Sequence, residues 1–436
     1  MGVKTKYTCY SVVVFISICL IVIGGLLNGN GTIKRDIESK LPKGKWTESM
    51  GQDSENPIIR VVIKTNGFKH LAHTEVGFQA KNGLVVYAKG EAREINPEEI
   101  LLLAPDDVML QADHIKIEAK NPSDKITVTT LKRGDGVPSY YGSFELIATA
   151  EGIVLVNELP VETYLYGVVP SEMPATYEME ALKAQAVCAR SYAYNQMKSY
   201  SYPEYQAHVD DSTSFQVYGN SEEHQNTTHA IDATKGQKVW YQGQVATTYY
   251  YSTSCGKTTS MEAWGKRSDG QYAYLKGVEV CSKDGYIYEK NLPWYRWSAT
   301  IPKKTLAKLI ELNTTTTIGT IQNISITKTG AGGVALELKV KGTKGSVTVA
   351  TENKIRLALG GKGYQIKKQD GTVTDSKELL PSAFFTIEKS GNNYIIQGGG
   401  FGHGIGMSQN GANEMAKLGK TYEEILQFFY HGVQVK

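Results

Sequence analysis

Apolar and polar residues alternate in short runs along the first part of the chain, from Ile58 to about residue 156. Turn-forming sequences separate these runs, for example Thr-Asn-Gly at 65–67 and Arg-Gly-Asp-Gly at 133–136. Alternation with a period of two, interrupted by turns, predicts β-strands. We therefore predict a β-rich unit over residues 58–150.

The pattern changes to helical spacing after Pro174 and Thr176, which are helix-start signals. Apolar residues and alanines from Met179 to Ala193 predict a helix over residues 177–197. The remaining patterns predict strands at 238–241, 245–251, 321–327, 334–340 and 393–397, and helices at 303–312, at 409–418 and after a Thr421–Glu424 capping box. Together they predict an α+β fold: a β-rich N-terminal unit, then a mixed α/β core over 151–436 with a β-rich insertion at about 300–390.

The first residues indicate the compartment. Lys4 and Lys6 precede an apolar stretch over 9–27, which is long enough to cross a bilayer core of about 30 Å as a helix. Because the basic residues come first, we expect the N-terminus in the cytoplasm and the rest outside. We predict a single membrane anchor at 1–28 and a linker at 29–57. A cleaved signal peptide is the alternative, although no Ala-x-Ala site closes the stretch.

Charge and cysteine content narrow the possibilities further. The net charge of +3 gives no electrostatic reason to expect a nucleic-acid partner. Cys255 and Cys281 would both lie outside the cell, where they either form a disulfide or remain free thiols.

Glu172 is the main candidate for catalysis. It lies between Pro170 and Pro174 in a mostly apolar run. Apolar surroundings raise the pKa of a Glu, as a general acid requires. The residues alone leave open the alternative that Glu172 is a helix-entry carboxylate interacting with the helix dipole.

Other candidates for binding accompany it. Lys183 and Arg190 are seven residues apart, so they project from one face of the predicted helix, where they could bind an anionic polymer or simply be solvated.

Two loops also carry candidate ligand-binding groups. The hydroxyls of Ser252, Thr253 and Ser254 follow a predicted strand, and His403 and Gln409 lie in and after a glycine-rich loop. These groups could bind a substrate or serve as ordinary turn and structural residues. The segment 208–216 contains His and Asp, but its spacing is poor for zinc, so we predict no metal and no cofactor.

These segments together resemble the stage II sporulation protein D family, which also includes proteins called amidase enhancers. The resemblance covers about residues 140–436. The segments that carry it are Tyr-Gly-Ser-Phe at 141–144, the runs 162–174 and 180–190, Ser-Thr-Ser at 252–254, Leu-Pro-Ser at 380–382, and Gly-His-Gly-Ile-Gly-Met-Ser-Gln at 402–409.

The resemblance implies a lytic transglycosylase, which cleaves peptidoglycan between N-acetylmuramic acid and N-acetylglucosamine without water and leaves a 1,6-anhydro end. Glu172 would be the catalytic acid, and Lys183 and Arg190 would contact the glycan. We also predict substrate contacts at Ser252, Thr253, Ser254, His403 and Gln409. The resemblance also implies a peptide-stripped substrate, a cell-wall amidase as partner, and a role in sporulation or wall remodelling.

This chain departs from the family pattern in two places. Some members hold zinc through cysteines where this chain has Asp210 and Phe215, and many have Gly at the position of Cys255. Three other functions stay open: a non-catalytic glycan-binding protein that stimulates an amidase, a structural surface protein, and a conventional hydrolase.

Overall fold

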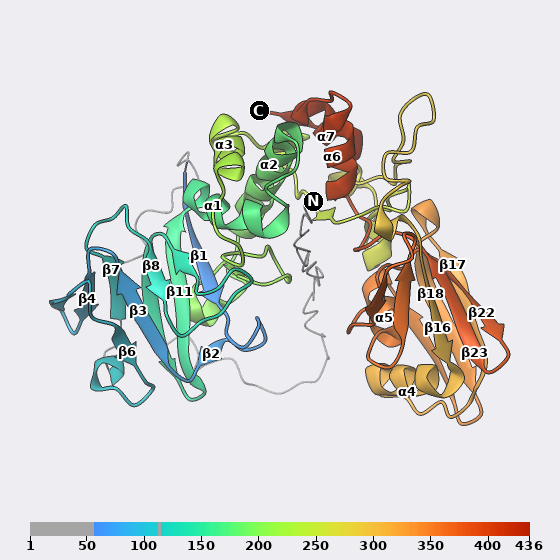
Figure 1. Cartoon of the computed structure of the whole chain (residues 1–436), viewed down its shortest axis with the longest axis horizontal. Helices are drawn as coiled ribbons and strands as arrows, with labels where there is room; N and C mark the ends of the chain where they lie inside the picture. Colours follow the sequence, from blue (N-terminus) through green and yellow to red (C-terminus); the bar gives the residue numbers. More distant parts are fainter. Residues whose placement is uncertain (1–55, 112–114) are drawn as a thin grey trace, which may run out of the picture.

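The computed structural model describes residues 56–111 and 115–436. Two sheet-bearing units lie on either side of a central group of helices (Figure 1), so the fold is α+β as predicted. The predicted anchor and nearly all of the predicted linker lie outside the described residues. Within the described ranges, no helix has the length and apolarity needed to cross a membrane.

The first unit is built from two sheets that share one core. An eight-stranded sheet has the order β12-β1-β11-β10-β7-β4-β5, with β2 added at β11, and a four-stranded sheet has the order β6-β3-β8-β9. Phe78 of one sheet contacts Phe144 of the other, with ring centroids 5.4 Å apart. The strands are β1 (Ile58–Ile63), β2 (Ala72–His73), β3 (Val76–Ala80), β4 (Leu84–Ala88), β5 (Glu91–Ile95), β6 (Leu101–Leu103), β7 (Ile115–Ala119), β8 (Ile126–Val128), β9 (Ser139–Tyr140), β10 (Ser143–Thr149), β11 (Gly152–Pro160) and β12 (Val209–Asp210).

Strand β11 is an interior strand of the large sheet and leads directly into α1. It pairs antiparallel with both β1 and β10, and most of its residues are buried. Strands β11 and β12 both come after residue 150, so the sheet that begins at Ile58 continues into the following segment.

Helix α2 joins the two halves of the molecule. Its residues Leu182 and Val187 pack into the core of the C-terminal half, whereas Ala186 and Ala189 pack into the core of the first unit. Small alanine side chains allow close packing on both sides. The central helices are α1 (Val161–Glu172), α2 (Met179–Gln196), α3 (Gln225–Ala233), α6 (Gln409–Lys417) and α7 (Tyr422–Phe429).

Short strands connect these helices to the chain around them. The strand β15 pairs parallel with β24, and β13 pairs with both β14 and β25. These strands are β13 (Val239–Tyr241), β14 (Gln244–Val245), β15 (Tyr250–Tyr251), β24 (Met407–Ser408) and β25 (Gln434–Val435).

The C-terminal unit contains a five-stranded sheet of order β21-β20-β16-β23-β22 and a three-stranded sheet of order β17-β18-β19. Pairing of β16 with β23 brings the start and the end of the unit together, so both connections reach the central helices from the same side. Its elements are β16 (Trp297–Pro302), α4 (Lys303–Thr314), β17 (Ile321–Thr329), β18 (Ala335–Gly342), β19 (Ser346–Ala350), α5 (Glu352–Leu359), β20 (Gln365–Lys368), β21 (Val373–Asp375), β22 (Phe385–Ser390) and β23 (Asn393–Gly398).

The predicted elements compare with the structure as follows. The helix predicted over 177–197 is α2, and the predicted capping box starts α7. Helices α1 and α3 were not predicted. The strand predicted over 245–251 forms only at its two ends, because the backbone between them bonds to single groups of other segments, such as the Tyr274 hydroxyl at Thr247.

Candidate active site around Glu172

Glu172 is the last residue of α1. Proline disfavours helical backbone angles in the residue before it, and Met173, which precedes Pro174, is extended at φ −133° and ψ 135°. Pro174 therefore ends α1 at Glu172, whereas Pro170 lies inside the helix. The expectation that Glu172 enters a helix is wrong, because the carboxylate is at a helix C-terminus, where the dipole disfavours negative charge.

The carboxyl group of Glu172 is held by neutral donors. The Val217 N–H donates to Oε1 at 2.7 Å, and the Tyr250 hydroxyl is a second donor. No Lys or Arg forms an ion pair with it among the described residues. Glu172 as a whole residue is half-buried, but its carboxyl group is buried. This burial raises the pKa of Glu172 to about 7, because the two hydrogen bonds lower the pKa by less than burial raises it. Such a group exchanges a proton readily near neutral pH.

Tyr250 is fixed by a residue from the segment that carries Val217. Gln216 donates to the Tyr250 hydroxyl at 3.0 Å, so this hydroxyl is free to donate to Glu172. A small hollow lies beside this pair, lined by Tyr192, Thr213, Phe215, Gln216, Thr248, Tyr249, Tyr250 and His403. The hollow reaches the Glu172 partner Tyr250, and aromatic side chains make up much of its lining.

Gln409 lies next to Glu172, and its amide is already used within the protein. Its Nε2 donates to the Glu172 carbonyl at 3.0 Å and to Gln185 Oε1 at 3.3 Å. The structure thus brings these two predicted site residues together. Gln409 holds the backbone of Glu172, which is a positioning contact.

His403 is buried and neutral. Its Nε2 donates to the Tyr250 carbonyl at 2.9 Å, because its Nδ1 accepts from the Ile405 N–H at 3.1 Å. Burial lowers the pKa of His403 to about 3, helped by the nearby charge of Arg356. Both ring nitrogens are therefore engaged, and His403 connects the glycine-rich loop to the strand that carries Tyr250.

The three hydroxyl residues of the 252–254 loop differ in exposure. Ser252 is half-buried, whereas Thr253 and Ser254 are buried. Asn410 donates to the Ser252 carbonyl at 3.1 Å and to Thr253 Oγ1 at 3.0 Å, which ties the loop to the start of α6. Of the three, only Ser252 is open to a ligand in this conformation.

Lys183 and Arg190 do not line the Glu172 site. Arg190 is fully buried, and its guanidinium donates to both carboxylate oxygens of Glu162 at 2.6 and 2.8 Å. The prediction that it presents a charge to a polymer is wrong for this structure. Pairing with Glu162, at the start of α1, uses that charge to join α1 to α2.

Lys183 is more accessible but faces elsewhere. Its Nζ pairs with Glu180 at 2.7 Å and lies over the Tyr422 ring. Lys183 is about 200° around α2 from Gln185, which contacts Gln409. Its contact with substrate stays a prediction.

The structure also describes the two cysteines and the segment 208–216, for which we predicted no metal. Cys255 and Cys281 have free thiols in this structure, so the disulfide alternative is not the form described. Asp210 and Asp211 pair with Lys64 and Arg133. Over 56–111 and 115–436, no group of three or more His, Cys, Asp or Glu residues is arranged to hold a metal ion.

Sequence reasoning missed Tyr250, Gln216 and Asn410. Tyr250 lies in a predicted strand, and Gln216 lies in the segment 208–216, whose spacing is poor for zinc. Neither pattern indicates that these two residues meet at Glu172. Asn410 follows Gln409 directly, so its place beside the glycine-rich motif was the one usable signal.

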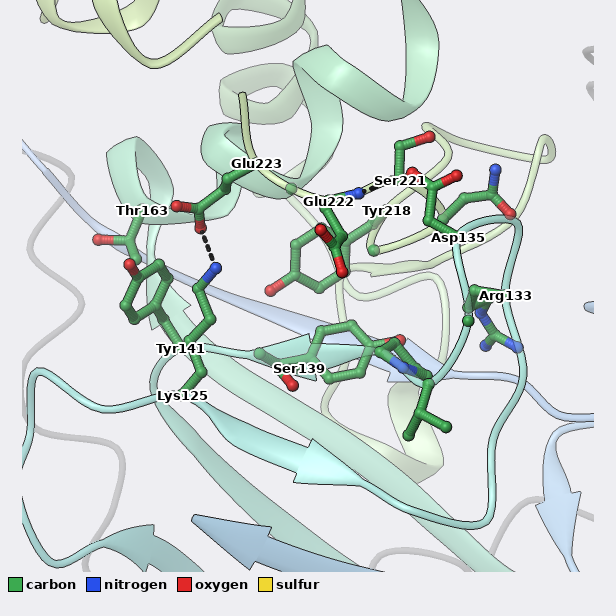
Figure 2. Close-up of a pocket in the computed structure, with 17 residues that line it drawn as sticks. Lys125, Arg133, Asp135, Ser139, Tyr141, Thr163, Tyr218, Ser221, Glu222 and Glu223 are labelled. Carbon is green, nitrogen blue, oxygen red and sulfur yellow. Dashed lines mark hydrogen bonds and ion pairs between the residues drawn. The ribbon is translucent and has the colours of Figure 1, made fainter. Parts of the chain in front are cut away.

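A larger pocket lies on the other side of α1, at the junction with the first unit (Figure 2). Lys125 and Glu223 form an ion pair of 2.8 Å at one side, and Asp135 lies at the other. Gly167, on its lining, is five residues before Glu172, about 7.5 Å along the helix axis. Tyr218, next to Val217, forms part of its lining, so the pocket and Glu172 share one supporting segment.

Comparison with known proteins places this site in a family. The family model described as "Stage II sporulation protein" matches residues 149–241, which include Glu172 and Val217. The chain is 32% identical over 357 residues to a stage II sporulation protein D of Bacillus subtilis, covering 77% of this chain and 92% of that protein. This chain belongs to the stage II sporulation protein D family.

Two other relatives of this chain extend the comparison. An uncharacterized protein of Brachyspira hyodysenteriae is 36% identical over 301 residues, which cover 68% of this chain and 72% of that protein. An amidase enhancer of Bacillus subtilis is 31% identical over 292 residues, 62% of this chain and 39% of the relative. A separate model, a domain of unknown function, matches residues 279–406.

The buried pair of Arg190 and Glu162 gives a stability prediction. Replacing Glu162 by Ala leaves Arg190 buried without a counter-charge, so we expect a loss of about 3–5 kcal/mol in unfolding free energy. Denaturant unfolding measures it. The exposed pair of Glu94 with Lys120 is the control, since Glu94→Ala should cost less than about 1 kcal/mol. Equal losses in both variants would contradict the assignment.

The raised pKa of Glu172 gives a pH dependence of stability. The folded protein keeps this proton up to about pH 7, whereas the unfolded chain loses it near 4.5, so stability falls as pH rises between them. Glu172→Gln removes this loss. Relative to wild type, we expect it to gain about 1–3 kcal/mol between pH 5 and pH 8 in unfolding experiments. The exposed Glu388→Gln should gain nothing, and a pH-independent effect of Glu172→Gln would refute the shift.

Proposed function

We propose that this protein is a peptidoglycan lytic transglycosylase that acts outside the cell, held to the membrane by its apolar stretch at residues 9–27. The observation that carries this proposal is the carboxyl group of Glu172, which is desolvated, has a pKa of about 7 and is fixed by two neutral donors. Family membership supports a substrate in the cell wall.

The proposed reaction needs one carboxyl group. Protonated Glu172 gives its proton to the oxygen between N-acetylmuramic acid and N-acetylglucosamine as the bond from C1 to that oxygen breaks. The 6-hydroxyl oxygen of the muramic acid then bonds to C1, and its proton passes to the Glu172 carboxylate. The acid is regenerated, no water is consumed, and the new end is a 1,6-anhydro sugar. Conventional glycosidases use a second carboxylate to activate water or to form a covalent intermediate.

The surroundings of Glu172 fit both proton transfers. At pH 7 the carboxyl is close to half protonated, so both its acid and its base form are available. Val217 and Tyr250 stabilise the carboxylate that forms after the first transfer. Gln409 limits movement of the Glu172 backbone, which keeps the acid in one place relative to a bound strand.

The relative named an amidase enhancer supports a second candidate function. In that case the protein binds glycan and stimulates a cell-wall amidase without cutting the strand. Both functions can use the same glycan-binding site. They differ in whether Glu172 takes part in cutting the glycan strand. An amidase that removes stem peptides is the partner we propose in either case.

Digestion of peptide-free glycan strands with the full-length protein tests the proposal. We expect mass spectrometry to find 1,6-anhydro ends with wild type, and about 10²–10⁴-fold fewer with Glu172→Gln. Glu388→Gln, on the surface of the C-terminal unit, is the control and should match wild type. Absence of products from wild type would favour the amidase-enhancing function, and reducing ends containing ¹⁸O from labelled water would indicate a conventional hydrolase.

The rate should also depend on pH in a defined direction. Because the acid must be protonated in the free enzyme, kcat/KM should fall about tenfold per pH unit above pH 7. Initial rates of 1,6-anhydro product formation between pH 5 and pH 9 measure this limb. A rate that keeps rising through pH 8 would argue against Glu172 as the acid.

A further inference from the structure

A second buried carboxylate, Glu289, lies beneath the candidate site and has no cationic partner among the described residues. It is fully buried, like Glu162 and Asp211, but those two carboxylates pair with Arg190 and Arg133. A buried carboxylate without a counter-charge costs free energy unless hydrogen bonds compensate it. Glu289 therefore depends on hydrogen bonds in place of a counter-charge, and its position connects the segments that supply those bonds.

Three hydrogen bonds hold the Glu289 carboxyl group, and they come from two segments. Its Oε1 accepts from the Ser254 N–H at 2.9 Å and from the Ser408 hydroxyl at 2.7 Å. Its Oε2 accepts from the Ser254 hydroxyl. Glu289 therefore joins the loop after β15 to Ser408, the residue that caps α6.

The capping of α6 depends on the same hydroxyl. Ser408 Oγ accepts from the Gly411 N–H at 3.3 Å while it donates to Glu289. A Cβ at Gly411 would lie 3.1 Å from Glu289 Oε2, so the first turn of α6 packs closely against this carboxylate. Burial raises the pKa of Glu289 to about 7, although the hydrogen bonds from Ser254 and Ser408 lower it in part.

The first residues of α6 then reach the candidate site. Gln409, directly after Ser408, donates to the Glu172 carbonyl at 3.0 Å. Asn410 donates to the Ser252 carbonyl and to Thr253 Oγ1. The residue that Glu289 holds and the residue that holds the Glu172 backbone are thus adjacent in the chain.

We propose that Glu289 is a positioning residue for the Glu172 site, which it sets by fixing the start of α6 and the 252–254 loop in one arrangement. The inference rests on the proposed function. Glu289 has no contact with Glu172 or with the glycan in this assignment, and it acts only through Ser408 and Gln409 and through Ser254.

Substitutions at Glu289 separate positioning from charge. Glu289→Gln keeps the size of the side chain and its hydrogen-bond partners. Its carbonyl can accept from Ser254 and Ser408, and its amide can donate to Ser254 Oγ, which still has a free lone pair. Glu289→Ala removes all three bonds. The Ser408→Ala variant removes the bond from Ser408 to Glu289 together with the Gly411 cap and the longer contact with the Ser252 carbonyl, and it serves where Glu289→Ala fails to fold.

Kinetics on peptide-free glycan strands with the full-length protein test the proposal. For Glu289→Ala we expect kcat to fall at least tenfold with KM changed less than threefold, and for Glu289→Gln we expect kcat within threefold of wild type. Ser408→Ala should lower kcat at least fivefold. The control is Asn313→Ala, which loses two hydrogen bonds in the C-terminal unit and should keep kcat within twofold at a similar loss of melting temperature.

Two results would overturn the inference: unchanged kcat in both Glu289→Ala and Ser408→Ala, or an equal loss of kcat in Glu289→Gln and Glu289→Ala. Failure of the proposed function is distinct, since wild type would then give no 1,6-anhydro products. A readout without turnover remains in that case. The pH midpoint of the stability difference between wild type and Glu172→Gln should shift by at least half a pH unit when Ser408→Ala is added, and an unchanged midpoint would count against the inference.

Discussion

The carboxyl group of Glu172 has to be kept out of water without a neighbouring cation, and much of the central region is arranged around this constraint. An adjacent Lys or Arg would lower its pKa and leave it ionised at neutral pH. The protein instead supplies a backbone N–H from Val217 and a hydroxyl from Tyr250, which stabilise the carboxylate less than a full charge would. The position at the end of α1 adds to the same effect, because a helix C-terminus disfavours an anion.

Charged side chains elsewhere in the central region are paired with side chains of opposite charge. Arg190 and Glu162 form a buried pair between α1 and α2, and Asp211 pairs with Arg133. His403, which bonds to the Tyr250 carbonyl, is neutral because burial and the nearby charge of Arg356 lower its pKa. The local field at Glu172 is therefore set mainly by dipoles, and the energetic cost of its burial is compensated by packing of the surrounding core.

Rigidity of the site comes from contacts that are distant in sequence. Gln409 and Gln216 are far apart along the chain, yet one holds the Glu172 backbone and the other holds Tyr250. Because Gln409 begins α6 and Gln216 lies in the loop after β12, the acid keeps its place only when these two segments pack correctly around the end of α1. This explains how a site with few polar groups can be well ordered.

The sequence by itself determined the α+β class and the positions of α2, α6 and α7, and it made Glu172 the main candidate for catalysis. These follow from local periodicity, a capping box and an apolar run with prolines, all of which are properties of neighbouring residues. Tertiary structure alone decided that Glu172 ends a helix, that Tyr250 and Gln409 meet it, and that Arg190 is buried against Glu162. Spacing along a helix places Lys183 and Arg190 on one face, but it cannot say whether solvent or another helix covers that face. That depends on long-range packing, which no local pattern contains.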